Sequence, residues 1–319
     1  LKNNFGSLFK TLFIDAFSFK LINKSLYQIY RADIFFKNNP NLKIVIAGNS
    51  DLFPPEISIS CKKNNVKTIS YEERIILSSW SNRIIFDYYF AAGPKSKNNL
   101  TNKNGEKLIS NIKEGFLLKT KNINQIDSEK KQLNCMVVDY YSESSWYLNG
   151  RASNHHYKES KFFYEIVLKL SNLFPNINFF LKSKSFQWLK IEYFKQIVFL
   201  IKAKKNITIL EDKKKWTPEN TLNNCSFGFG VHSSILDEMF STGKPIVIFN
   251  RNEYPSKVFD YGEPIIANDE REIINKFTLI NANFANYNKN LDTYRKKLFF
   301  EKNFEKFQQD LSIISKSIK

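Results

Sequence analysis

The chain has 319 residues, 42% of them hydrophobic, and 48 Lys and Arg against 31 Asp and Glu give it a formal net charge of +17. This length exceeds what one hydrophobic core usually serves, and the apolar content excludes a disordered chain, so we expect two domains. The positive charge could attract nucleic acid, anionic lipid or phosphorylated ligands. Alternatively, many of the lysines are simply solvated and reflect a coding bias toward Lys, Asn, Ile and Phe.

Three widely separated cysteines, Cys61, Cys135 and Cys225, each lie in or beside an apolar run. This spacing favours buried free thiols over disulfides or metal ligands, and with them a reducing compartment. The run closest to a membrane span, residues 196–201, is far shorter than the roughly 18–20 residues that cross a bilayer. We therefore expect a cytoplasmic protein, although the start at Leu1 instead of Met leaves open what precedes it.

In the first half of the chain, short apolar runs alternate with amphipathic segments, which predicts βα units around a mostly parallel sheet. Strands are predicted at 42–48, 67–73 and 83–93, with a helix at about 55–64. The polar segment 119–134 lacks hydrophobic periodicity, and we place the domain boundary there.

The second half repeats the alternation of strand and helix. Strands are predicted at 135–141, 176–182, 206–210, 226–230 and 245–250, and helices at 160–174, 186–204, 233–242 and from about 290. His155 and His156 fall in a predicted polar loop, 142–160, with no partner at zinc spacing. The sequence thus predicts an α/β fold of two Rossmann-like, doubly wound parallel-sheet domains that face a cleft. The first domain comprises residues 1–130 and the second residues 131–290. Residues 291–319 are expected to form a helix that packs back on the first domain.

A polar turn precedes the helix at 233–242 in the segment "GVHSSILDEMFSTGKPIVIFN", residues 230–250. Ser233 or Ser234 is a natural N-cap, and the two hydroxyls beside the free amides of a helix start also suit a phosphate. His232 either donates to that phosphate or satisfies a backbone carbonyl. Glu238 either complements the helix dipole or accepts from ribose hydroxyls.

Other polar residues follow predicted strands, where open parallel sheets bind their ligands. Glu72 and Glu73 end one strand of the first domain, and Lys182 and Lys184 end one of the second. The glutamates are either catalytic or a solvated strand end. No phosphate-binding Gly-rich loop follows the first strand, which disfavours nicotinamide and ATP-hydrolysis chemistry. No acidic pair has a convincing metal-binding spacing.

The segment "CSFGFGVHSSILDEMFSTGKPIVIFN" resembles the nucleotide-binding region of GT-B glycosyltransferases of bacterial surface and capsular polysaccharide biosynthesis. The similarity is to the group of CMP-Kdo and CMP-sialic acid transferases and CDP-glycerol glycerophosphotransferases, and it extends over roughly residues 42–265. Many of these proteins carry Lys-x-His-Pro where this chain has "FFLKSKSF", so the lysine is matched and the His-Pro is absent. The resemblance makes 1–130 the acceptor domain and 131–290 the nucleotide-sugar domain.

The resemblance implies a glycosyltransferase that moves a sugar from a nucleotide-activated donor, with CMP one candidate nucleotide, to a saccharide or lipid-linked saccharide acceptor. Glu72 or Glu73 would take the acceptor proton. The donor would be bound without metal or cofactor by Lys182, Lys184, His232, Ser233, Ser234 and Glu238. The basic surface would contact anionic lipid at the inner membrane, and no nucleic-acid partner is expected.

Three alternatives remain open. A polyol-phosphate transferase or a sugar epimerase would use the same fold, although an epimerase needs more acid and base groups than the sequence identifies. A non-catalytic basic protein that binds RNA or another anionic polymer would show aromatic and basic residues interleaved on an exposed face, whereas the aromatics here lie mainly within strands and at core helical spacing. The missing His-Pro also fits a transferase that has lost activity.

Overall fold

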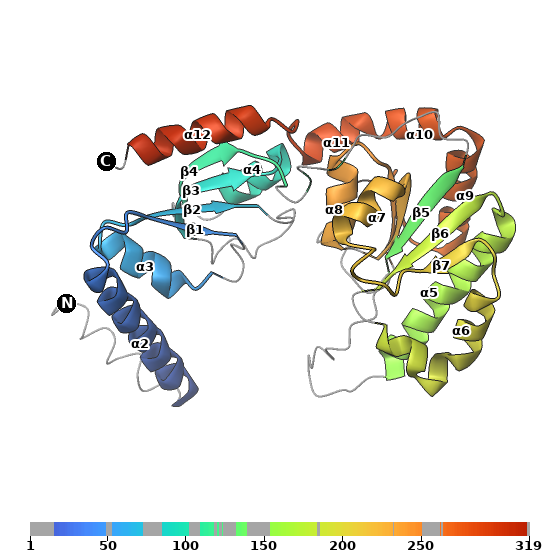
Figure 1. Ribbon diagram of the computed structural model, residues 1–319, viewed down its shortest axis with the longest axis horizontal. Coiled ribbons are helices and arrows are strands. Elements are labelled where there is room, and N and C mark those ends of the chain that lie inside the picture. The colour runs from blue at the N-terminus through green and yellow to red at the C-terminus, as the bar shows by residue number, and fades with distance from the viewer. Residues whose placement is uncertain are drawn as a thin grey trace.

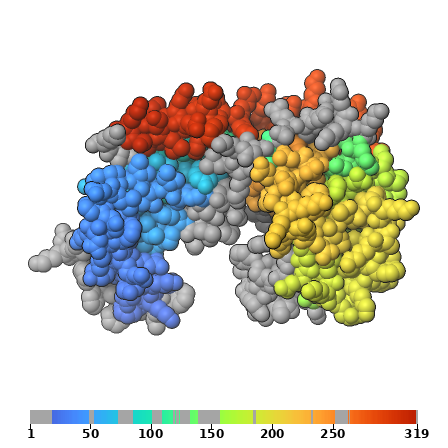
Figure 2. Space-filling model, viewed as in Figure 1, coloured from blue at the N-terminus to red at the C-terminus, as the bar shows by residue number. Residues whose placement is uncertain are grey.

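The computed structural model describes residues 16–48, 53–72, 85–101, 109–117, 120, 123, 132–138, 154–183, 186–231, 233–250, 262 and 264–317, with backbone alone for 16–18, 101 and 154–156. These residues form two separate parallel sheets with helices packed on them (Figure 1). Figure 2 shows the two lobes separated by a wide notch and bridged on one side by the C-terminal helices. The predicted α/β architecture of two parallel-sheet domains is confirmed.

The first sheet has the order β1-β2-β3-β4, in which every neighbouring pair is parallel. Its elements are β1 (Ile44–Ala47), α3 (Pro55–Lys63), β2 (Lys67–Tyr71), β3 (Phe86–Ala91), α4 (Pro94–Thr101) and β4 (Ile109–Glu114). Side chains alternate along β3, so that Tyr88 and Phe90 face one side and Tyr89 and Ala91 the other. The sheet therefore needs an apolar layer on each face.

Helix α2 (Ala16–Asn38) precedes this sheet and packs on α3, a helix that the sequence patterns did not predict. Phe36 is buried against Cys61 and Val66. The hydroxyl of Ser25 donates to Glu56 over 2.6 Å. Asp33 accepts hydrogen bonds from the side chains of Ser60, Lys63 and Asn64.

The second sheet has the order β10-β9-β8-β5-β6-β7 and is also entirely parallel. Its strands are β5 (Leu133–Val138), β6 (Ile177–Lys182), β7 (Ile207–Ile209), β8 (Phe227–Gly230), β9 (Ile246–Phe249) and β10 (Ile266–Ala267). Its helices are α5 (Asn154–Leu173), α6 (Lys195–Lys202), α7 (Pro218–Asn224), α8 (Ser234–Ser241), α9 (Glu270–Ala282) and α10 (Phe284–Asn290).

Two predicted boundaries in this domain are wrong. Helix α5 begins at Asn154, so His155 and His156 belong to a helix and not to a loop. The segment predicted as one helix over 186–204 is broken, because Ile191 is extended and separates two short 3₁₀ turns, 187–190 and 192–194, from each other before α6 begins. Trp188 and Phe194 in these turns are fully buried, so core packing determines the break.

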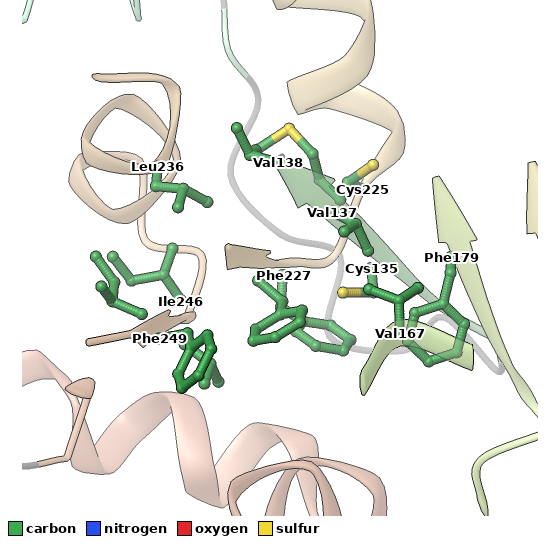
Figure 3. Packing of buried hydrophobic residues seen from close by; sticks show 14 of the residues in the cluster. Cys135, Val137, Val138, Val167, Phe179, Cys225, Phe227, Leu236, Ile246 and Phe249 are labelled. Atoms are coloured by element: carbon green, nitrogen blue, oxygen red, sulfur yellow. The ribbon is translucent and has the colours of Figure 1, made fainter. Parts of the chain in front are cut away.

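The core of the second domain fills both faces of its sheet, as the unalternating apolar strands predict. Figure 3 shows part of it, including Cys135 on β5, Phe179 on β6, Phe227 on β8 and Leu236 on α8. All three cysteines are buried and free, which confirms that prediction. Burial raises the pKa of the Cys61 thiol to about 12, so it stays protonated and unreactive at neutral pH. In the described part of the chain, no helix has the length and apolar character to cross a membrane.

The last segment of the chain crosses from the second domain to the first through α11 (Asp292–Leu298) and α12 (Phe304–Lys316). At the crossing, the amide of Phe300 donates to the carbonyl of Ala92 over 2.9 Å. Gly93 lies so close that an added Cβ would be 1.5 Å from the carbonyl oxygen of Leu298. Only glycine permits this approach of the two backbones.

Helix α12 supplies the layer that covers one face of the first sheet (Figure 1). The ring of Phe307 packs edge-to-face on Phe90 with centroids 4.7 Å apart, and on Phe116 at 5.6 Å. The ammonium of Lys306 donates to Glu114 over 2.7 Å, and this contact lowers the pKa of the Glu114 carboxyl. The C-terminal helix is thus part of the core of the N-terminal domain.

Replacing Phe307 by Ala should lower the free energy of unfolding by about 3 kcal/mol, because it removes a buried ring from the layer between α12 and the sheet. Urea unfolding followed by circular dichroism measures this loss. The matched control is Ile313→Ala on the same helix, where the side chain is 63% exposed and a change within about 0.5 kcal/mol is expected. Equal effects of the two substitutions would show that α12 does not cover the sheet in solution.

Candidate functional site

The strand order of the second domain creates a topological switch point between β5 and β8. From β5 the chain proceeds outward to β6 and β7, and then returns to the other side of β5 to form β8, β9 and β10. The connections that leave the carboxyl ends of β5 and β8 therefore diverge, and this is where open α/β sheets bind ligands. The connection after β5, residues 139–153, lies outside the described residues.

Two glycines in β8 bring the elements at this point close together. A Cβ on Gly230 would lie 2.4 Å from the carbonyl oxygen of Val138 at the end of β5. A Cβ on Gly228 would lie 2.6 Å from Leu236 and 2.8 Å from the sulfur of Met239, both on α8. The missing side chains let α8 pack directly on β8, so its N-terminus lies at the switch point.

The N-terminus of α8 lacks a side-chain cap. Ser233 is at the N-cap position with extended backbone, φ −154° and ψ 144°, but its hydroxyl accepts no hydrogen bond from the helix. Ser234 is the first helical residue, and both serines are half-buried. The first amides of a helix have no helical acceptor, and here the serine that normally satisfies one of them does not. Two hydroxyls, uncapped amides and the positive end of the helix dipole are suited to an anion such as a phosphate.

Glu238 lies four residues after Ser234, which places both on the same face of α8. Its side chain is only 4% exposed, and Asp237 beside it is fully buried. Both carboxylates lie near the N-terminal half of the helix, where the dipole stabilises negative charge. His232, predicted to donate to a phosphate, lies outside the described residues.

Lys182 ends β6, on the opposite side of β5 from β8. Its ammonium donates to the carbonyl of Trp216 over 2.7 Å, and Trp216 in turn packs against Phe180 with ring centroids 5.6 Å apart. Burial lowers the pKa of Lys182. The lysine holds the loop after β7 at the carboxyl edge of the sheet. Lys184 lies outside the described residues.

Glu72 follows β2 in the first domain and is fully buried. One carboxylate oxygen accepts from the amide of Ala92 over 2.6 Å, and the other accepts from the hydroxyl of Ser96 over 2.5 Å. These bonds tie the end of β2 to the start of α4. This geometry favours a structural role for Glu72 over the predicted role as a base, and Glu73 lies outside the described residues.

The sequence patterns missed the residues that shape the site rather than line it. Gly228 and Gly230 lie in a predicted strand, and glycine inside a strand is a signal for the close approach of another element. The contact of Trp216 with Lys182 had no local signal. Among the residues with defined positions, no three His, Cys, Asp or Glu side chains come together as a metal site would require. Metal independence stays a prediction.

Comparison with protein-family models and with curated proteins gives no match. Comparison with solved structures gives many. UDP-GlcNAc 2-epimerase from Methanocaldococcus jannaschii has a TM-score of 0.59 at 12% identity, over 91% of this chain and 81% of that one. The Neisseria meningitidis UDP-GlcNAc 2-epimerase bound to UDP-GlcNAc has a TM-score of 0.51 at 14% identity, over 87% and 76%. S. aureus MnaA with UDP has a TM-score of 0.51 at 10% identity, over 87% and 74%.

At these identities the likeness shows the fold, which is the GT-B-like arrangement expected from the sequence. It corrects the expectation of a glycosyltransferase, because several structures with this fold are named as UDP-GlcNAc 2-epimerases and none of those reported above is named as a glycosyltransferase. The similarity to CMP-Kdo and CMP-sialic acid transferases rested on short patterns such as His-Ser-Ser at a helix start. Such a pattern describes a helix start that many proteins can share, and it does not identify the reaction.

Replacing Glu72 by Gln should lower the free energy of unfolding by about 1–3 kcal/mol. One of the two accepting oxygens becomes an NH₂ group, which cannot accept a hydrogen bond from the Ala92 amide or the Ser96 hydroxyl. Chemical denaturation measures the loss. In the Ser96→Ala background the loss should be smaller, since one of the donors is gone. The exposed Glu301→Gln serves as control. Unchanged stability of the Glu72→Gln protein would argue against the structural role.

Proposed function

We propose that this chain binds a nucleotide-activated sugar with its phosphates at the N-terminus of α8, and that it epimerises the sugar. The observation that carries the proposal is the uncapped start of α8 at the switch point of the second sheet. A helix start whose first amides receive no side-chain cap, with two serine hydroxyls beside them, is suited to a diphosphate without a metal ion.

The choice of nucleotide follows from the structures with the same fold. The N. meningitidis protein was crystallised with UDP-GlcNAc, the S. aureus protein with UDP, and an M. jannaschii epimerase with both. These names support a UDP-sugar as the ligand and epimerisation as the reaction. UDP-GlcNAc is therefore the first compound to test.

The proposed roles follow from position. Ser233 and Ser234 bind phosphate together with the α8 amides, and Glu238 on the same helix face accepts from the ribose. Lys182 adds positive charge at the same edge of the sheet. Inverting a carbon centre by proton transfer needs one group to remove a proton and another to return it on the opposite face. With Glu72 engaged between β2 and α4, Glu73 is the first-domain residue proposed as the base.

Substituting Ser233 by Asp separates phosphate binding from helix capping. Asp is a good N-cap and suits the helix dipole, so the unfolding temperature without ligand should be unchanged or higher. The added carboxylate repels a diphosphate, so the affinity for UDP should fall at least about tenfold. Thermal shift and calorimetry with UDP, CMP, CDP and GDP measure both effects.

The matched control is Thr217→Asp at the N-cap of α7, where the threonine already accepts from the amide of Asn220. It adds the same charge to another helix start of the domain and should leave UDP binding unchanged. Equal losses in the two variants would show a general effect of charge. Undiminished UDP binding by Ser233→Asp would remove α8 as the phosphate site.

Turnover is followed by proton NMR of UDP-GlcNAc incubated with the protein. We expect a second UDP-sugar to appear until the two epimers reach equilibrium, and Glu73→Gln to slow this at least about 100-fold with little change in KM. If UDP-GlcNAc binds and remains unchanged, nucleotide-sugar binding stands and epimerisation is excluded for this substrate.

A further inference from the structure

The outer face of α2 is the largest exposed apolar feature on a single helix of the described chain. Phe19, Leu26, Tyr27 and Tyr30 each leave half or more of their surface exposed. With 23 residues the helix is about 35 Å long. Contiguous exposed apolar surface of this kind marks an interaction site.

This face is not part of an unfinished core, because the opposite face of α2 already packs on α3. The inward residues recur at helical spacing, from Ile22 through Ile29 to Phe36, and their exposure falls to 5% at Phe36. Asp33 on the same inward side is held by Ser60 and Asn64. The outer face is therefore free to meet a partner without unfolding the domain.

The charge on this face has one sign. Lys20, Lys24, Arg31 and Lys37 are exposed, and Arg31 lies over the ring of Tyr27 at 5.8 Å from its centroid. The only acidic residue of α2 is Asp33, which is buried. The outer face thus combines aromatic and aliphatic side chains with cations and offers no exposed carboxylate.

We infer that α2 docks on an anionic lipid surface, with its outer face in the headgroup region. Aromatic rings and basic side chains on one helix face are suited to that region, where the rings reach the acyl boundary and the cations contact phosphate. Docking of a second copy through the same face would bring like charges together in a symmetric contact, which disfavours it. The basic C-terminal helix, in contrast, is engaged with the first sheet through Phe307 and Lys306.

The test is flotation of the full chain with vesicles of equal parts phosphatidylglycerol and phosphatidylcholine, and with phosphatidylcholine alone. Two variants remove the two properties of the outer face separately. Leu26→Ser/Tyr30→Ser removes apolar surface, and Lys20→Glu/Lys24→Glu/Arg31→Glu reverses its charge. Matched controls on the second domain are Phe199→Ser/Leu279→Ser and Lys202→Glu/Lys205→Glu/Lys214→Glu, which change exposed residues of the same kinds.

We expect binding to the anionic vesicles alone, at least about tenfold weaker in each α2 variant and within about twofold of the parent in each control. Thermal unfolding checks that all variants fold. If Leu26→Ser/Tyr30→Ser does not fold, the vesicle binding of Lys20→Glu/Lys24→Glu/Arg31→Glu tests the inference alone. The inference is overturned if the parent fails to bind, or if the controls lose as much as the α2 variants. It is also overturned if sedimentation shows a dimer that the α2 variants dissociate while vesicles are not bound.

Discussion

The close contact of β8 with β5 and α8 is the constraint on which the candidate site depends. Gly228 and Gly230 have no side chains to hold these elements apart, and any Cβ there would collide with Val138 or Leu236. Because α8 can lie directly against the strand, its first turn begins at the point where the strand order reverses. The chemistry proposed for Ser233 and Ser234 thus follows from a packing requirement at Gly228 and Gly230, three to six residues earlier in the chain.

A second constraint joins the domains. The chain leaves the second domain after α11, passes Gly93 at backbone contact, and ends in α12 on the first sheet. This crossing joins the two lobes on one side of the molecule. A notch separates them on the other side (Figure 2). The hydrogen bond of Phe300 to Ala92 lies beside Glu72, which also holds the amide of Ala92. Glu72, one of the two glutamates for which the resemblance implies a catalytic role, is therefore also part of the joint between the domains.

Local patterns in the sequence were sufficient for the class of fold and for eight strands, because buried parallel strands such as β5 and β6 are mostly apolar. They missed β4, which is largely polar, and β10, which has only two residues. They were also sufficient to locate Ser233 and Ser234 at a helix start.

The sequence patterns failed where contacts between residues far apart in the chain determine the structure. Glu72 looks like a solvated strand end until Ser96 and Ala92 are seen to bind it, and the helix from 186 to 204 is broken by the burial of Trp188 and Phe194. Helix α2 has a weak pattern because both its inner and its outer faces carry apolar residues. The reaction itself was beyond reach, since one fold supports both transfer and epimerisation.

The position of α12 also determines an order of events during synthesis. The first sheet has one face covered by α3 and α4, whose residues leave the ribosome early, and the other by a helix that begins at Phe304, after all the strands of the second domain. Until that helix is released, Tyr88 and Phe90 lack the layer that buries them. The second domain has most of its core between β5 and α10, so it can bury its strands before α12 is made. Domains usually fold in the order in which they are made. In this protein the N-terminal domain is the one that must wait.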